Sequence, residues 1–327
     1  MRTLNKLAVG AALLASASVV SIAAMAKDLT VGVSWSNFQE ERWKTDEAAI
    51  KKALEAHGAK YISADAQASP TKQLTDVESL IAKGANVLIV SATDPSALCP
   101  TLNEAMKKGI TVVTYDSDAP SCRDLFVNQA STAEIGTSEV DLLAKELHDT
   151  GEIGIVSAAA TATNQNAWIG YMKQELTKYP KMKLVSIVYG NDDPPTATQV
   201  TEGLLEKYPN LKGIISPTTV GILAAAQVVA TPKWKGKVIV TGLGTPDEMK
   251  AYVADGVAPA FVLWNPANLG YLAAYAAVNL ASKKITNAQG QTFTAGKLGK
   301  YTVGADHTIL LGPPTVFNSS NINNFNF

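Results

Sequence analysis

Short apolar runs alternate along the chain with longer amphipathic segments, and this alternation predicts an α/β protein. The apolar runs read LTVGV, AKYISAD, VLIVSA, ITVVTYD, IGIVSA, KLVSIVYG, KGIISP, KVIVTGL and APAFVLW. Helix-like segments lie between them, such as TDEAAIKKALEAHG, TKQLTDVESLIAKG and PSALCPTLNEAMKKG, and each of these ends in glycine, a frequent helix stop. The pattern favours parallel sheets that are covered by helices, with strands buried on both faces.

The strand–helix pattern runs twice along the sequence. A first set ends near LFVNQAS and a second begins at GEIGIVSA, with no Pro/Gly/Ser-rich linker between them. The chain is also longer than one hydrophobic core usually serves. We therefore expect two α/β domains that are joined by a hinge, with a cleft between them.

The first 26 residues have the pattern of a secretory signal peptide. Arg2 and Lys6 precede an alanine-rich apolar stretch that ends in Ala24, Met25 and Ala26, so we expect export and cleavage near Ala26. A transmembrane anchor is the alternative. Three serines interrupt the stretch, however, and it falls short of the ~20 strongly apolar residues that cross a bilayer.

The charge and the motif content argue against several classes of function. The net charge is −1 and no basic run occurs, which argues against nucleic acid as a partner. The histidines lie far apart, and the chain has no H-E-x-x-H, G-x-S-x-G or P-loop motif, so neither a metal nor a cofactor is expected. Asp116 and Asp118 follow one strand, but two carboxylates at this spacing are weak evidence for an acid/base pair. We therefore do not expect an enzyme.

The two cysteines, Cys99 and Cys122, each lie just past an apolar strand candidate. If those strands are parallel neighbours, both cysteines lie at the same edge of the sheet. In an exported chain an even number of cysteines allows one disulfide, which we expect here. Two buried thiols are the alternative.

Polar and aromatic side chains recur just past the predicted strands. Open α/β sheets bind ligands outside the carboxyl ends of their strands, so these side chains are the candidates for a binding site. Aromatic rings can stack on the C–H faces of a sugar or polyol, while Asp, Asn and Arg bind its hydroxyls. The candidate ligand-binding residues are Trp35, Arg42, Trp43, Thr93, Asp116, Asn164, Gln165, Trp168, Pro217, Thr219, Gly244, Trp264 and Asn265.

Several of these residues also have a purely structural alternative. Asp116 alone is compatible with a helix N-cap. Trp43 could pack on the first helix, Glu41 and Arg42 could form a solvated pair, and the later tryptophans could belong to a core. Because such side chains recur at the same end of several strands, we favour a ligand-binding cleft.

With these residues the chain resembles the periplasmic sugar-binding proteins of ABC importers, the ribose/xylose-type group with the type I fold. The resemblance covers essentially the whole mature chain. It implies two Rossmann-like domains of residues 28–129 plus 264–308 and 130–263 plus 309–327. The three crossing segments would lie near Gln129–Ser131, Phe261–Asn265 and Thr308–Gly312.

The same resemblance implies how the protein works and with what. A periplasmic monomer would close on a sugar or polyol and present it to an ABC permease in the inner membrane, without converting it. A chemoreceptor is a further partner that the resemblance allows. A LacI-type regulator shares the core fold but needs an N-terminal helix-turn-helix, where this chain has its signal peptide pattern. A periplasmic sugar hydrolase or isomerase would depend on Asp116 and Asp118.

Two branches of this family match different stretches of the chain. EERW, which includes Arg42, is similar to the first ligand loop of xylose-binding proteins, whose arginine contacts the sugar. Asp116 in YDSD matches the family's acceptor for sugar hydroxyls. The stretches LCPTLNEAMKKG, TYDSD, SCRDLFVNQ, TNQNAW and FNSSNINNFNF resemble the rhamnose/autoinducer-2 branch instead.

The ligand expected from that second branch depends on which of its residues are kept. Asp116, Gln165 and Pro217 match its ligand-holding residues, and Asn265 takes the place of a polar hinge residue. In contrast, Asn164 replaces an acidic residue, Thr219 an alanine and Trp35 a lysine. These replacements change the charge of the pocket. The expected ligand is therefore a neutral monosaccharide, deoxy sugar or polyol, with autoinducer-2 as the alternative.

Overall fold

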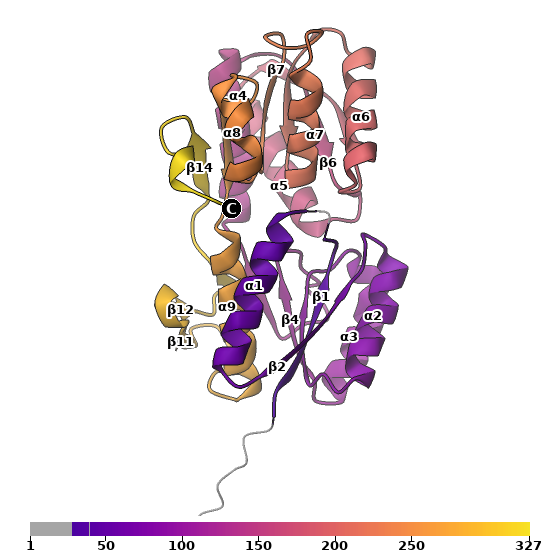
Figure 1. Ribbon diagram of the computed structural model, residues 1–327, viewed down its shortest axis with the longest axis vertical. Coiled ribbons are helices and arrows are strands. Elements are labelled where there is room, and N and C mark those ends of the chain that lie inside the picture. Colours follow the sequence, from indigo (N-terminus) through magenta and orange to yellow (C-terminus); the bar gives the residue numbers. More distant parts are fainter. Residues whose placement is uncertain (1–27, 39) are drawn as a thin grey trace, which may run out of the picture.

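The computed structural model describes residues 28–38 and 40–327, which form two α/β halves stacked along the long axis of the molecule (Figure 1). The predicted signal peptide, residues 1–26, lies outside the described residues. Within the described part of the chain, no helix has the length and apolar character needed to cross a membrane.

The first half contains a sheet in which every neighbouring pair of strands is parallel, as the alternating pattern predicts. Its strands run in the order β13-β5-β4-β3-β1-β2. Their bounds are β1 (Thr30–Trp35), β2 (Lys60–Asp65), β3 (Val87–Val90), β4 (Thr111–Tyr115), β5 (Leu125–Asn128) and β13 (Thr308–Leu310).

Helices cover both faces of this sheet, which explains why its central strands are apolar throughout. On β3, Val87 and Ile89 belong to the core that includes α1 and α9, whereas Leu88 and Val90 belong to the core beneath α2 and α3. The covering helices are α1 (Arg42–Ala56), α2 (Pro70–Ala82), α3 (Pro95–Lys107) and α9 (Pro266–Ala281).

Local sequence signals set the starts of two of these helices. Ser69 caps α2 by accepting a hydrogen bond from the backbone N–H of Lys72, and the Asp94 carboxylate caps α3. In both helices proline occupies the first helical position, where its missing N–H costs no hydrogen bond. Cys99 on α3 forms the expected disulfide with Cys122, in the segment after β4.

The second half contains a parallel sheet with the strand order β7-β6-β8-β9. Its strands are β6 (Thr150–Ser157), β7 (Lys181–Tyr189), β8 (Leu211–Ser216) and β9 (Ile239–Gly242). Around this sheet, α4 packs against α5, and α6 packs against α7. The helices of this half are α4 (Thr132–Leu147), α5 (Thr163–Glu175), α6 (Pro194–Lys207), α7 (Thr219–Val229) and α8 (Pro246–Ala254).

The run APAFVLW meets the predicted parallel sheet through an isolated parallel bridge, between Val262 and Leu243, and not through a ladder. This run forms β10 (Ala260–Leu263), which pairs antiparallel with β14 (Thr315–Asn318) near the C-terminus. A hairpin of β11 (Thr292–Thr294) and β12 (Lys300–Thr302) lies between α9 and β13 in the chain.

The chain passes three times between the two halves. The passages join β5 to α4, β10 to α9, and β13 to β14, because α9 and β13 pack in the first half and β14 in the second. The carboxyl ends of β1, β3 and β4 thereby face those of β6, β7 and β8 across the junction. The residue boundaries assigned to the two domains stay a prediction.

Candidate ligand-binding site

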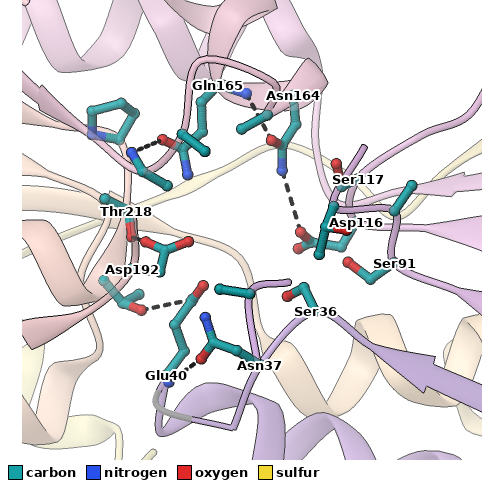
Figure 2. A pocket seen from close by; sticks show the side chains of 18 of the residues that line it. Ser36, Asn37, Glu40, Ser91, Asp116, Ser117, Asn164, Gln165, Asp192 and Thr218 are labelled. Carbon is teal, nitrogen blue, oxygen red and sulfur yellow. Dashed lines mark hydrogen bonds between the residues drawn. The ribbon is translucent and has the colours of Figure 1, made fainter. Parts of the chain in front are cut away.

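A cavity of about 120 Å³ lies between the two halves, at the carboxyl ends of their strands (Figure 2). This is the place where open α/β sheets bind ligands. The first half contributes Ser36, Asn37, Glu40, Arg42, Trp43, Ala68, Pro70, Ser91, Ala92, Thr93, Asp116 and Ser117. The second half contributes Ala158, Ala159, Thr161, Ala162, Asn164, Gln165, Trp168, Asn191, Asp192, Pro217, Thr218, Thr219 and Leu243, and Trp264 lies in the passage before α9.

Most of the residues proposed from the sequence meet at this cavity. Those that line it are Arg42, Trp43, Thr93, Asp116, Asn164, Gln165, Trp168, Pro217, Thr219 and Trp264. The structure places them together, and their role in binding a ligand stays a prediction.

Three of the proposed residues do not line the cavity. Trp35 is the last residue of β1 and is fully buried, and its indole N–H donates to the Tyr61 hydroxyl at 3.3 Å. Gly244 follows β9, and its backbone N–H donates to the carbonyl of Val262. Asn265 caps α9, because its side-chain oxygen accepts from the backbone N–H of Asn268 at 3.0 Å. In each case the side chain or backbone serves the fold.

Arg42 is the only positively charged side chain among the described residues that line the cavity. It is the first residue of α1, whereas the sequence pattern predicted a helix that begins at Thr45. Its Nε donates to Glu40 Oε2 at 2.9 Å, and its Nη1 lies 3.1 Å from Asp116 Oδ2 and 3.7 Å from Asp46 Oδ2. Burial disfavours the charge on Arg42, but the three carboxylates outweigh it and raise the pKa of the guanidinium above its ordinary value. The alternative of a solvated pair of Glu41 and Arg42 is therefore wrong, because Arg42 is buried and Glu41 pairs with Lys44.

Tryptophan rings surround the same guanidinium group. The guanidinium carbon of Arg42 lies 3.8 Å from the centroid of the Trp43 ring and 5.3 Å from that of Trp264. Trp264 in turn lies 6.1 Å from the ring of Trp168, which comes from the second half. These contacts hold Arg42 by cation–π attraction and give the cavity an aromatic wall.

Asp116 lies at the end of β4 with a positive φ of 62°, an uncommon conformation for a residue other than glycine. It does not cap a helix, since β5 is the next element of the chain. Its Oδ1 accepts from Asn164 Nδ2 at 3.3 Å, and its Oδ2 accepts from Gln129 Nε2 at 3.4 Å. Burial raises the pKa of Asp116, while the Arg42 guanidinium acts in the opposite direction.

The first turn of α5 supplies two amides to the second-half wall. Gln165 Oε1 accepts from Ser157 Oγ at 2.6 Å and from the backbone N–H of Ala158 at 2.8 Å. Because its oxygen is held in this way, the amide nitrogen of Gln165 points toward the cavity (Figure 2). Asn164 Oδ1 accepts from the backbone N–H of Gln165, which leaves the Asn164 amide group to reach Asp116.

Hydrogen bonds join the two halves around the cavity. Thr219 Oγ1 in the second half donates to Glu40 Oε2 in the first at 2.9 Å. Thr163 Oγ1 donates to the backbone carbonyl of Asp118 at 3.0 Å, alongside the Asn164–Asp116 contact. The structure is therefore that of a closed cleft.

The sequence interpretation missed several polar lining residues, of which Glu40 and Asp192 are charged. Asp192 follows β7 and accepts a hydrogen bond from Thr218 Oγ1. Burial raises the pKa of Asp192 well above its ordinary value, and the neighbouring Glu40 carboxylate adds to this rise. The rule that ligands bind just past the carboxyl ends of strands (the strand-end rule) also predicts Asp192, because the run KLVSIVYG leads directly into N-D-D. The polar lining residues outside the candidate set are Ser36, Asn37, Glu40, Ser91, Ser117, Thr161, Asn191, Asp192 and Thr218.

Asp118 does not form an acid/base pair with Asp116. Its two carboxylate oxygens bind Arg123, at 2.6 Å from Nε and 2.9 Å from Nη2. Thr114 Oγ1 also donates to Asp118, at 2.5 Å. Asp118 thus braces the loop after β4 and is not among the residues that line the cavity.

Comparison with known proteins places this geometry in a family. Residues 31–285 match the family model of the periplasmic binding protein domain. The ribose import binding protein RbsB of Bacillus subtilis is 25% identical over 263 residues, which cover 79% of this chain and 83% of RbsB.

Several of the similar solved structures contain a bound ligand. An ABC transporter solute-binding protein from Clostridium phytofermentas with bound L-rhamnose has 36% sequence identity and a TM-score of 0.88, over 91% of this chain and 98% of its own. LsrB from Clostridium saccharobutylicum in complex with AI-2 has 25% identity and a TM-score of 0.84, over 91% of this chain and all of its own.

Proposed function

The chain belongs to the periplasmic binding protein family and has its type I fold, and from this premise we propose that it captures a neutral monosaccharide, deoxy sugar or polyol. The ligand would bind in the cavity between the halves and be delivered to an ABC permease in the inner membrane. The observation that carries the proposal is the closed cavity, in which Arg42, Asp116 and Gln165 converge beside tryptophan rings.

The chemistry of the cavity wall fits a ligand that is rich in hydroxyl groups. A hydroxyl both donates and accepts hydrogen bonds. The carboxylates of Glu40 and Asp116 can accept, whereas the Gln165 amide nitrogen and the Arg42 guanidinium can donate. A hydrogen bond to a charged group contributes about 1.5–3 kcal/mol, so a few such bonds discriminate between ligands.

The size of the cavity supports a ligand of one sugar ring or less. Its volume is about 120 Å³. Sites for drug-sized molecules have about 300–1,000 Å³. The indole rings of Trp43, Trp168 and Trp264 supply apolar surface on which the C–H groups of such a ligand can pack.

The mechanism of this proposal is closure without chemistry. A ligand that contacts Asp116 in one half and Gln165 in the other binds the closed form better than an open one, and so shifts the equilibrium toward closure. The Thr219–Glu40 hydrogen bond already joins the halves and sets their register. The closed form would present surfaces of both halves to the permease.

The proposal includes the cellular setting expected from the sequence. The protein would be exported, cleaved near Ala26 and act as a periplasmic monomer, and it could also hand its ligand to a chemoreceptor. Its two domains would be residues 28–129 plus 264–308 and 130–263 plus 309–327.

Autoinducer-2 is the second candidate ligand, because the AI-2 complex of LsrB shares the fold over nearly the whole described chain. The charge of the site supports it less well. Asn164 supplies a neutral amide where the resemblance implies a carboxylate, and Trp35 lies in the core where it implies a lysine.

A thermal-shift screen tests the proposal. The mature protein is heated with pentoses, hexoses, deoxy sugars, polyols and autoinducer-2, each in turn. A ligand that binds only the native state stabilises it by about 2.7 kcal/mol at a hundredfold over its Kd. We expect one narrow group of sugars or polyols to raise the Tm and to be recovered unchanged, and Arg42→Ala and Asp116→Ala to lose the shift. A flat screen, or consumption of the ligand, would contradict the proposal.

A further inference from the structure

The cavity holds more negative charge than its one arginine balances. Among the described residues that line it, the charged ones are Glu40, Arg42, Asp116 and Asp192. Asp46 lies just behind, with its Oδ2 at 3.7 Å from Arg42 Nη1. The closed site therefore sets one guanidinium group against four carboxyl groups.

The negative charge that Arg42 does not balance is located at Asp192. Arg42 directs Nε to Glu40 and Nη1 to Asp116, and its contact with Asp46 is the longest of the three. The Thr218 side chain, a neutral hydroxyl, donates a hydrogen bond to Asp192. No cationic group of the described chain forms an ion pair with it.

Closure of the cleft brings Asp192 against a second carboxyl group. Asp192 comes from the second half and Glu40 from the first, and the two side chains lie close together at one end of the cavity (Figure 2). They are within hydrogen-bonding reach of each other. Two carboxyl groups can form a hydrogen bond only if one of them carries a proton. The closed geometry is thus favourable for a singly protonated pair and unfavourable for two anions.

Apart from Arg42, the other described groups around Asp192 and Glu40 supply no positive charge that would stabilise both carboxyl groups as anions. Thr218 and Thr219 at the start of α7 donate neutral hydrogen bonds to Asp192 and Glu40. On α8, Glu248 adds a further carboxyl group, which accepts from Thr245 Oγ1. Asp193, at the start of α6, accepts from Thr196 and so caps that helix.

We propose that Asp192 is a specificity-determining residue, which holds a proton with Glu40 in the closed cleft and so restricts the ligand to uncharged polyhydroxy compounds. This inference rests on the proposed function and adds two properties to it. Binding of a neutral sugar takes up a proton. A ligand with a carboxylate or phosphate group is rejected, because it would add negative charge to a site that already has too much.

The sign of the pH dependence follows from the closed geometry. Burial in the closed cleft, together with the neighbouring Glu40 carboxylate, raises the pKa of Asp192 well above its ordinary value, so the protonated form of Asp192 favours the closed, ligand-bound state. Affinity for a neutral sugar is therefore highest at low pH and falls as the pH rises toward the raised pKa. With one proton taken up, the affinity changes by at most about tenfold per pH unit.

Isothermal titration calorimetry between about pH 5 and pH 8 tests the inference within the range of ordinary protein stability. The probes are L-rhamnose, D-ribose and D-arabinose, each paired with its aldonate: L-rhamnonate, D-ribonate and D-arabinonate. The proteins are the wild type, Asp192→Asn and the control Glu41→Gln. Glu41 is exposed, pairs with Lys44 and does not line the cavity, so its substitution removes a nearby charge without touching the pair.

We expect the wild type to bind a neutral sugar more weakly as the pH rises, and to bind the matching aldonate at least tenfold more weakly. Asp192→Asn resembles the protonated residue, so its affinity for a neutral sugar should be independent of pH. Glu41→Gln should keep the wild-type slope. Titration of the wild type in two buffers of different ionisation enthalpy measures the proton directly and needs no variant.

The outcomes separate this inference from the proposed function. A sugar that binds the wild type with the same affinity at every pH, or an aldonate that binds as well as its sugar, overturns the inference and leaves sugar binding intact. An unchanged pH slope in Asp192→Asn also overturns it. If no probe binds at any pH while the wider screen is flat as well, the proposed function fails and the inference fails with it.

Discussion

Nη1 of Arg42 lies 3.1 Å from Oδ2 of Asp116, and this ion pair joins the first turn of α1 to the end of β4. Both side chains are almost completely buried, with 6% and 3% exposed. The pair holds one oxygen of Asp116 toward the arginine, while the other oxygen faces Asn164 of the second half. Arg42 in the first half therefore orients Asp116, and Asn164 in the second half contacts it only when the cleft is closed.

Substitution of Asp116 by asparagine should weaken ligand binding strongly. The variant keeps the volume of the side chain but loses the charge that accepts from ligand hydroxyls and pairs with Arg42. The loss of one charged hydrogen bond, about 1.5–3 kcal/mol, corresponds to roughly a 10- to 150-fold rise in Kd, measurable by calorimetry with the sugar found in the screen. Asp118→Asn is the matched control, because Asp118 binds Arg123 outside the cavity. Equal affinity losses in both variants would show that Asp116 has no special role.

The strand-end rule located Arg42, Asp116 and Gln165 because parallel strands deliver the residues that follow them to one edge of the sheet. It could not tell where a strand ends. Trp35 is still part of β1, so its side chain alternates into the core and packs against Tyr115. Asp192 follows β7 in the same way, so its place at the cavity is also encoded by the position of a strand end.

Pairings between distant segments could not be predicted from local patterns. The run that forms β10 is as apolar as the parallel strands, yet Ala260 pairs with Asn318 in an antiparallel ladder. Similarly, the contact of Glu40 with Thr219 spans 179 positions in the sequence. Such contacts depend on how the two halves close, and no local spacing encodes that.

The disulfide between Cys99 and Cys122 should stabilise the fold without contributing to binding. It closes a segment with a sequence separation of 23, for which loop-closure entropy gives about 3 kcal/mol. We expect Cys99→Ser with Cys122→Ser to lower the free energy of unfolding in urea by about this amount, and ligand affinity to remain within twofold. The wild type in a reducing buffer should show the same loss. If reduction leaves the urea midpoint unchanged, this role for the disulfide is wrong.

Glu139 should lower the free energy of unfolding at neutral pH, compared with a neutral side chain at the same position. Its side chain is fully buried in α4, and neither carboxyl oxygen has a hydrogen-bond partner within the described part of the chain. Burial raises the pKa of Glu139 well above its ordinary value. A carboxyl group whose pKa is raised in the folded state favours folding at low pH and loses this advantage as the pH rises above its ordinary range.

We therefore expect Glu139→Gln to raise the free energy of unfolding near pH 7 by about 1–3 kcal/mol. The gain should shrink as the pH falls through about 4, because Glu139 then becomes protonated in the unfolded state as well as in the folded state. Urea unfolding of the two proteins across this range measures the difference. Glu152→Gln, on β6, is a control with an only partly buried side chain. A gain that is the same at every pH would mean that the charge of Glu139 is not its cause.

Close packing of α9 against α1 should be needed for the geometry of the binding site. Gly270 on α9 faces the backbone of α1, and a Cβ added there would lie 2.6 Å from the carbonyl oxygen of Asp46. Gly270→Ala must then push the helices apart, at a cost of about 1–3 kcal/mol, and shift Asp46 and Arg42 with them. Gly203→Ala is the control, since its Cβ would meet nothing within 4 Å and alanine favours the helix. We expect Gly270→Ala to lower both the Tm and the sugar affinity, and Gly203→Ala to lower neither. A Gly270→Ala protein that loses stability but keeps full affinity would show that α1 holds Arg42 in place without α9.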